Sequence, residues 1–170
     1  MDFSLEIATD KHAEQICTIW ESGWHEAHSE IVPQRLCELR TTKSFSQRTA
    51  DNLGNTHVAV GKALVLGFCM VREDELYQMY VSPKARGTGV AQALMSDAEN
   101  RIRVNGHDMA WLACAVGNDR AARFYEKSGW INGGPEVVDL DTSTGAFALE
   151  VWRFERSLNQ SNAGKVRSVN

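Results

Sequence analysis

The chain has 170 residues, of which 43% are hydrophobic and 24% charged, which are ordinary values for one soluble globular domain with its own core. Its formal net charge of −4 gives no support for a nucleic-acid or membrane partner. The four cysteines form no CxxC pair, so no metal site is expected. Neither a signal peptide nor an apolar run long enough to span a bilayer is recognisable, so a cytoplasmic protein is expected.

The first part of the chain predicts one strand followed by two helices. Residues 3–8 alternate apolar and polar side chains, as a strand does. Thr9 or Asp10 offers an N-cap for a helix with apolar side chains at helical spacing. A second helical region is expected near Pro33, since proline suits a first helical turn. Residues 41–56 are polar and receive no assignment.

The remaining elements predict an α/β domain with a largely antiparallel sheet. Three extended runs separated by short turns, residues 56–60, 63–71 and 75–81, indicate an antiparallel meander. A helix with one apolar face, a buried strand, a short helix and two late strands follow; their predicted ranges are 90–104, 109–116, 118–128, 130–132 and 147–154. Residues 1–158 are expected to form a single domain, and residues 159–170, which lack apolar periodicity, a mobile tail.

The stretch VSPKARGTGVAQ lies between the predicted strand 75–81 and the predicted helix 90–104. Unpaired N–H groups and the positive end of the helix dipole make such a junction an anion site. Gly87 and Gly89 would let the backbone approach a phosphate, with Lys84 and Arg86 adding positive charge. A tight turn that binds nothing explains the glycines equally well. The pattern is neither GxGxxG nor GxxxxGK[ST], which disfavours a dinucleotide fold and nucleoside triphosphate hydrolysis.

A second motif, NDRAARFYEKSGW at residues 118–130, places Asn118, Ala122 and Tyr125 on one helical face. Taken singly, such residues are typical of an N-cap and a packed core. Taken together with the preceding R-G-x-G-x-A loop, the pattern N-x-x-A-x-x-F-Y-x-x-x-G-W resembles the GNAT superfamily of N-acetyltransferases over Leu64–Trp130.

This resemblance implies a mixed, largely antiparallel sheet of six or seven strands flanked by about four helices, with acetyl-CoA as co-substrate. Backbone amides of the loop would hold the pyrophosphate; these residues are Arg86, Gly87, Thr88, Gly89, Val90, Ala91 and Gln92. Met79, Tyr80 and Val81 would bind the pantetheine arm like an added strand. Asn118 would contact the cofactor and Tyr125 would act as general acid. Ala91 stands where the family more commonly has the last glycine of the loop, and alanine is a frequent variant there.

Acetyl transfer needs a proton donor for the departing thiolate and a base for the amine. The phenol of Tyr125, with an ordinary pKa of about 10, is protonated at neutral pH, although a packed ring that only orients the sulfur is the alternative. Glu75 is the candidate base. In a regular strand it shares a face with Tyr77, Met79 and Val81, and it would act through a water chain. A bulge would break this parity.

Two alternatives for the base remain open from the residues alone. Glu73 and Asp74 precede Glu75, and all three could be solvated turn carboxylates without a catalytic role.

The acceptor pocket is expected beside the first two helices and the late hairpin. Trp20, Trp24 and His28 form one row of a helix that also carries His25 and Glu30, and the stretch resembles the tryptophan-rich helix of many relatives. An ordinary helix with a core face and a wet face is the alternative. Two histidines three residues apart, without a third ligand, make no metal site.

The sequence therefore predicts an acetyl-CoA-dependent N-acetyltransferase that acts on a primary amine of a small molecule, a peptide or a protein. The acidic balance mildly favours a cationic amine. A non-catalytic acyl-CoA-binding module and an acyltransferase using a longer acyl-CoA are the alternatives. The resemblance also makes a homodimer through the late strands one of the oligomeric states to be tested.

Overall fold

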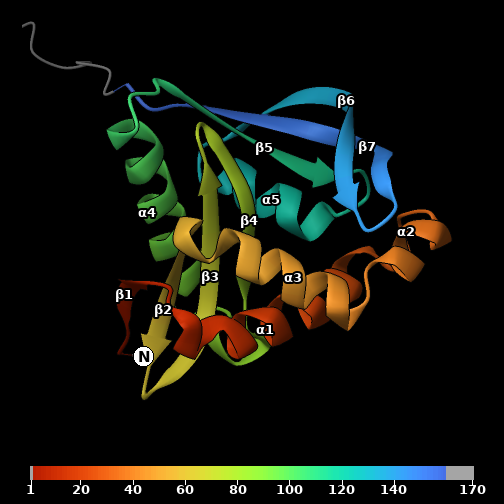
Figure 1. The fold of residues 1–170 in the computed structure, drawn as a ribbon. Coiled ribbons are helices and arrows are strands. Elements are labelled where there is room, and N and C mark those ends of the chain that lie inside the picture. Colours follow the sequence, from red (N-terminus) through yellow and green to blue (C-terminus); the bar gives the residue numbers. More distant parts are fainter. Residues whose placement is uncertain (1, 160–170) are drawn as a thin grey trace, which may run out of the picture.

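In the computed structural model, the described residues 2–159 form one seven-stranded sheet and five α-helices (Figure 1). The strand order is β1-β2-β3-β4-β5-β7-β6, and every neighbouring pair is antiparallel except β4 and β5. This confirms the predicted α/β fold with a largely antiparallel sheet. Apart from Asn159, the tail predicted for residues 159–170 lies outside the described residues.

The strands are β1 (Ser4–Ile7), β2 (Thr56–Gly61), β3 (Leu64–Arg72), β4 (Glu75–Val81), β5 (Met109–Ala115), β6 (Ile131–Thr142) and β7 (Gly145–Ser157). The helices are α1 (Asp10–His28), α2 (Gln34–Leu39), α3 (Thr42–Asn52), α4 (Val90–Val104) and α5 (Asp119–Lys127). The helix α3 was not predicted, and β6 and β7 are much longer than the strands expected there.

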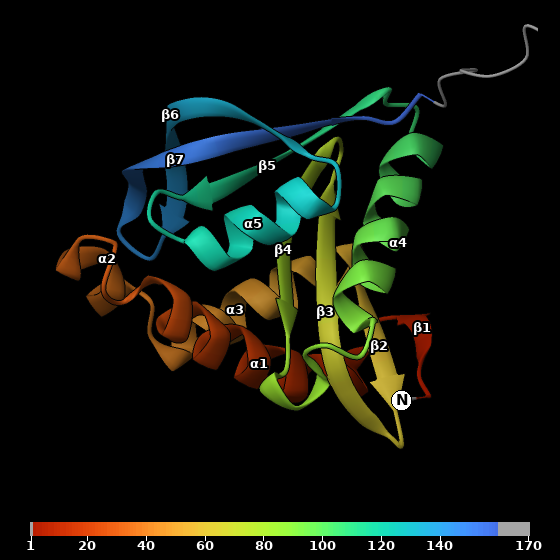
Figure 2. The ribbon, with the colours of Figure 1, turned by 180° about the vertical axis from the view of Figure 1, so that it is seen from behind.

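The sheet is covered on both faces, so it carries two cores. The helices α1 and α3 lie over one face and α4 and α5 over the other (Figures 1 and 2). Trp20, Phe45 and Phe68 are fully buried on the α1 side, whereas Leu94 and Ile102 are fully buried on the α4 side. These aromatic and aliphatic side chains fix the sheet between its helices.

The parallel strands β4 and β5 are joined at one end and then separate. One residue pair, Glu75 with Trp111, is in register between them, and the Trp111 N–H donates to the Asp74 carbonyl at 3.1 Å. The opposite edge of β4 pairs with β3 as far as Val81. Beyond Leu76, therefore, the backbone of β4 has a free edge facing β5.

A β-bulge in β4 corrects one expectation about Glu75. Met70 pairs with Gln78 but Val71 with Leu76, so Tyr77 is an extra residue in this strand. Leu76 consequently shares the α4-side core with Met79 and Val81, while Tyr77 packs on the α1 side. The prediction that Glu75 shares a face with Met79 and Val81 is wrong, because the bulge shifts the alternation by one residue.

A half-buried ion cluster joins α4 to the meander and gives a stability prediction. The Asp97 carboxylate accepts from His57 Nδ1 (3.0 Å) and lies 3.6 Å from Arg101 Nη1. These groups outweigh burial and lower the pKa of Asp97, so its contribution is present above the ordinary pKa and is lost as pH falls through the folded-state value. Asp97→Asn should lower the free energy of unfolding by about 1–3 kcal/mol at pH 7.

Urea unfolding as a function of pH tests this prediction. The difference between wild type and Asp97→Asn should shrink in acid, where the wild-type carboxyl is also neutral. The exposed Asp51, which accepts from Gln47, is a control: Asp51→Asn should change the free energy by less than about 0.5 kcal/mol. A pH-independent difference at Asp97 would contradict the ionic role.

Candidate active site

A cavity of about 530 Å³ opens where β4 and β5 separate, bordered by α1, α5 and the β6–β7 hairpin. Of the site residues predicted from sequence, those lining this cavity are Glu75, Met79, Tyr80, Val81, Arg86, Gly87, Ala91, Asn118 and Tyr125. Thr88, Gly89, Val90 and Gln92 do not line it, and the Val90 side chain is fully buried in the α4-side core. The structure thus brings two distant motifs, the glycine loop and α5, to one cavity.

The glycine loop joins β4 to the N-terminus of α4, as its sequence indicates. Gly87 and Gly89 have φ values of 75° and 90°, and Gly89 is the N-cap of α4. A Cβ added at either position would meet no atom within 4 Å, so the backbone conformation rather than local space requires glycine. The loop amides and the first N–H groups of α4 form a site suited to an anion.

Arg86 is tied to the neighbouring helix α1 rather than left free beside the loop. Its Nη1 and Nη2 donate to the Glu26 carboxylate at 3.1 and 2.6 Å, and Arg120 Nη1 donates to the same group at 3.0 Å. These hydrogen bonds lower the pKa of Glu26 to about 2. Arg86 is therefore held by Glu26, which Arg120 shares, and the backbone amides are left as the freer donors of this loop.

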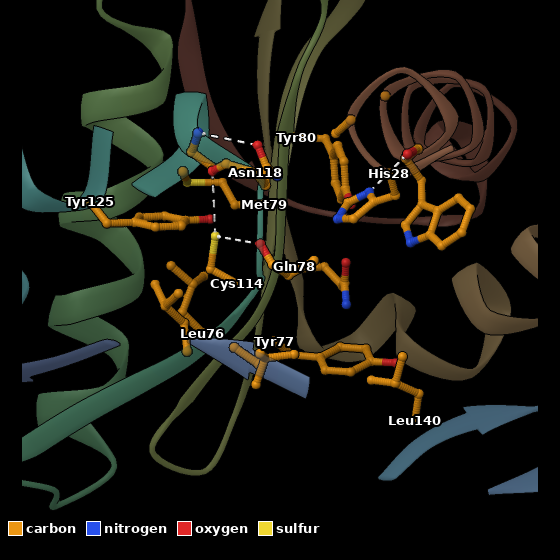
Figure 3. Close-up of a pocket in the computed structure, with 18 of the residues that line it drawn as sticks. His28, Leu76, Tyr77, Gln78, Met79, Tyr80, Cys114, Asn118, Tyr125 and Leu140 are labelled. Atoms are coloured by element: carbon orange, nitrogen blue, oxygen red, sulfur yellow. Dashed lines mark hydrogen bonds between the residues drawn. The ribbon is translucent and has the colours of Figure 1, made fainter. Parts of the chain in front are cut away.

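The helix α5 presents Asn118 and Tyr125 to the cavity. Asn118 Oδ1 caps the helix by accepting from the Ala121 N–H at 3.3 Å, so its side-chain NH₂ group is the part able to donate to a ligand. The Tyr125 hydroxyl points toward Cys114, Asn118 and Met79 (Figure 3). Burial, together with the nearby Cys114 and Tyr80, raises the pKa of Tyr125, so the phenol is protonated and able to donate.

Cys114 is a cavity residue whose role sequence reasoning did not anticipate. Its Sγ lies 3.8 Å from the Asn118 carbonyl, and burial raises its pKa to about 12. A thiol with such a pKa is no nucleophile at neutral pH, so Cys114 shapes the cavity beside Tyr125.

Glu75 is the carboxyl group of the cavity with properties suited to a base. Burial raises its pKa to about 7; Asp74 and Asp141 add to the rise, and Arg72 and Arg153 oppose it. A base with a pKa near the working pH combines a useful ionised fraction with proton affinity. Glu73 and Asp74 do not line the cavity, and the Asp74 carboxylate accepts from Trp111 Nε1 at 3.1 Å.

His28 adds a second basic group on the α1 side of the cavity. Its Nδ1 lies 2.8 Å from the Trp24 carbonyl, which can only accept, so Nδ1 carries the hydrogen and Nε2 a lone pair. Burial is the main cause that lowers the pKa of His28 and keeps the ring neutral. Sequence reasoning placed His28 beside the acceptor, but no sequence signal gave its tautomer.

The other residues of the tryptophan-rich stretch divide between core and surface. Trp24 lines the cavity, and Trp20 is fully buried behind it. His25 Nε2 donates to the Arg40 carbonyl at 2.9 Å, and Glu30 is exposed outside the cavity.

Three arginines, at the end of α2, in α3 and at the end of β3, line the cavity, although sequence reasoning singled out none of them. Arg48 Nη2 donates to the Tyr77 hydroxyl at 2.9 Å, and Arg72 lies over the Tyr77 ring with Cζ 3.6 Å from its centroid. Arg40 completes the group. These three positions in the chain converge only in the folded protein.

Within residues 2–159 no three metal-ligating side chains converge. None of the helices in this described part is long and apolar enough to cross a membrane.

Comparisons with known proteins match the chain to a family and to a fold. A family model described as the acetyltransferase (GNAT) family matches residues 13–130. An uncharacterized N-acetyltransferase of Mycobacterium tuberculosis is 31% identical over 113 residues, which cover 61% of this chain and 72% of that protein.

Two solved structures share the fold across nearly the whole chain. A Salmonella typhimurium structure solved with its cofactor acetyl-CoA has a TM-score of 0.69 at 14% identity, covering 98% of this chain and 99% of that chain. A phosphinothricin acetyltransferase from Sinorhizobium meliloti in complex with acetyl-CoA has a TM-score of 0.67 at 18% identity, covering 97% of this chain and 93% of that chain.

Proposed function

The chain belongs to the acetyltransferase (GNAT) family, and from this premise we propose that it transfers the acetyl group of acetyl-CoA to a primary amine of a small molecule, a peptide or a protein. The observation that carries the proposal is the free edge of β4, which lies between the glycine loop and the Tyr125 hydroxyl. Phosphate donors, an extended backbone edge and a proton donor thus line one cavity.

Acetyl-CoA fits the donors that the cavity provides. The backbone from Met79 to Val81 would hold the pantetheine arm in the manner of an added strand, since amide groups on this edge have no β5 partner. The amides from Arg86 to Gln92 would hold the pyrophosphate. The two solved structures of the same fold that contain acetyl-CoA support acetyl-CoA as the ligand of this cavity.

The residues around the cavity supply the chemistry of direct transfer. The amine nitrogen attacks the thioester carbonyl carbon, the carbon–sulfur bond breaks, and Tyr125 gives its proton to the departing thiolate. Glu75 receives the proton of the attacking amine through water, with His28 as the second candidate. Backbone N–H groups on the free edge of β4 stabilise the charge that develops on the carbonyl oxygen.

Two other functions remain as alternatives to be tested. A non-catalytic acyl-CoA-binding module would use the same loop without needing Tyr125, and a longer acyl chain would need more room beside Cys114. Isothermal titration with acetyl-CoA, followed by an assay of CoA release with an amine panel, separates these functions. Binding without amine-dependent CoA release would favour the module, and an absence of binding would overturn the proposal.

Gly89→Ala should weaken acetyl-CoA binding by about tenfold or more. An L-residue in the left-handed conformation costs about 1–2 kcal/mol, and relieving that strain moves the loop amides away from the pyrophosphate. Isothermal titration measures the effect. Arg86→Ala should have a smaller effect, because its guanidinium already pairs with Glu26.

Gly106→Ala is the matched control for this variant. Gly106 follows the other end of α4, has a φ of 95°, and its added Cβ would also meet no atom within 4 Å. Both alanine substitutions should lower the free energy of unfolding by a similar amount, but only Gly89→Ala should lower the affinity for acetyl-CoA. Equal acetyl-CoA affinities in the two variants would contradict the loop assignment.

A further inference from the structure

Two arginines at the acceptor side of the cavity have buried donors without partners. Arg40 is 3% exposed and lines the cavity, and the half-buried Arg48 lies beside it. Nε of both side chains and Nη1 of Arg48 are buried and make no hydrogen bond. Burial and the neighbouring positive charge of Arg48 lower the pKa of Arg40 to about 10. Buried cations of this kind are costly unless an anion pairs with them.

The protein itself provides oriented but uncharged partners. Arg40 Nη1 donates to the Asp141 carbonyl at 2.7 Å, and Arg48 Nη2 donates to the Tyr77 hydroxyl at 2.9 Å. The Arg48 guanidinium also lies over the Trp20 ring, with Cζ 4.3 Å from the centroid. Within residues 2–159 neither arginine forms an ion pair with a carboxylate. These contacts fix both guanidinium groups in place without neutralising them.

The carboxylate of Asp141 does not fill this role. Its side chain is 83% exposed and lies 3.9 Å from Arg72, the third arginine of the group. Asp141 also lines the cavity, but its ion pair is with Arg72. Neither Arg40 nor Arg48 therefore has a carboxylate partner among residues 2–159.

The arginine pair lies on the acceptor side of β4, across the strand from the proton donor. Figure 3 shows Tyr125 and Cys114 on one side, and Tyr77, His28 and Leu140 on the other. Arg40, Arg48 and Tyr125 all line the one cavity of about 530 Å³, so a single small molecule can place an anion on the arginine pair and an amine near Tyr125.

We infer that Arg40 and Arg48 bind an oxyanion carried by the acceptor, so that the substrate is a small amine with its own carboxylate or phosphate group. The inference rests on the proposed acetyl transfer and specifies its acceptor class. Guanidinium groups match both oxyanions with paired N–H donors. Leu36, Leu140 and Leu149 line the same cavity, and such apolar neighbours strengthen the attraction.

The depth of the site also selects the kind of acceptor. The Arg40 side chain is only 3% exposed, so an oxyanion can reach it when the oxyanion lies at the end of a slim ligand. A protein lysine carries no anion near its reacting amine, so it would leave both guanidinium groups unpaired. The local charge thus opposes the cationic amine that the overall charge of −4 favoured.

Matched acceptors test the inference in a CoA-release assay. The panel contains amino acids, the amines that correspond to them without the carboxyl group, and aminoalkyl phosphates with their parent amino alcohols. In at least one pair the anionic member should have a kcat/KM about 30-fold or more above its neutral partner, and the pair that responds identifies the oxyanion. Arg48→Met, which keeps a side chain over Trp20, should lower kcat/KM for that member by about 10²-fold. Arg48→Lys should restore part of the loss.

Each outcome bears on the inference separately from the proposed function. The inference is wrong, and acetyl transfer stands, if amines are acetylated equally with and without an anionic group. The same holds if Arg48→Met leaves the ratio of kcat/KM between the anionic and the neutral member of a pair unchanged. In a second assay, anionic panel members should raise the melting temperature of the CoA-bound wild type but not of Arg48→Met. If no anionic member does so and none is acetylated, the inference is overturned even when acetyl-CoA binds.

Discussion

Tyr125→Phe should lower kcat by about 10²–10⁴-fold and leave the dissociation constant for acetyl-CoA unchanged. The substitution removes the hydroxyl that points toward Cys114 and Met79. It keeps the ring, whose centroid lies 5.5 Å from that of the Phe154 ring. Because burial raises the pKa of this phenol, it stays protonated throughout the working pH range. Steady-state kinetics and isothermal titration on the same preparation provide the two constants.

A second variant separates the lost proton donor from lost packing. Phe124 is the neighbour of Tyr125 on α5, with ring centroids 5.7 Å apart. Phe124→Leu removes aromatic packing from this helix without removing a hydroxyl, so its smaller loss of kcat measures the packing effect. A Tyr125→Phe enzyme within threefold of the wild-type kcat would contradict the general-acid role and favour a hydroxyl that only orients the sulfur.

Glu75→Gln should lower kcat/KM by about 10²-fold at pH 8 and remove the acidic limb of the pH profile. The base acts when deprotonated, and the pKa of Glu75 is raised to about 7. The wild-type rate should therefore rise as pH increases through about 7 and then reach a plateau. The measurement is kcat/KM from pH 5.5 to pH 9 for both proteins.

The same pKa predicts an effect of opposite sign on stability. Its folded-state value lies above the ordinary 4.5, so the ionised carboxylate destabilises the fold increasingly between about pH 4.5 and 7. Glu75→Gln should accordingly be more stable than wild type at pH 8 and similar to it at pH 4.

The exposed Glu73 is the control for the base assignment. It lies outside the cavity, with a side chain that is 88% exposed, so Glu73→Gln should keep the wild-type profile. If the acidic limb survives in Glu75→Gln and disappears in His28→Gln, His28 is the base and the Glu75 assignment is wrong.

Features encoded in short stretches of sequence were predictable. The residues at positive φ in the loop are glycines, and α4 has a clear apolar face, so residues 90–104 were assigned correctly as a helix. Asn118 acts as the N-cap that its position before α5 indicated. Each of these features depends on local backbone preference and periodicity.

Features that depend on pairing between strands were harder to predict. The bulge at Tyr77 appears only when β4 is aligned with β3, and it changes which face Glu75 occupies. Gly133, Gly134 and Pro135 resemble a loop, yet β6 continues through them with a register shift against β7. Cross-strand partners determine both outcomes, and no local pattern shows them.

The arginine pair was missed for a different reason. Arg48 lies in the stretch 41–56, whose polar composition hid a helix that is capped by Thr41 and anchored by Phe45. The pair also needs α2, α3 and β4 to meet. Whether an arginine is buried or solvated cannot be read from the sequence, so a buried charge is recognised only in the folded protein.

Mass spectrometry of a reaction containing the protein, acetyl-CoA and the matched amine panel tests acetyl transfer most directly. We expect an oxyanion-bearing amine to gain one acetyl group for each CoA released, and Tyr125→Phe to bind acetyl-CoA but form product at least 10²-fold more slowly. If acetyl-CoA binds and no amine of the panel gains an acetyl group, the central claim of acetyl transfer to an amine is contradicted.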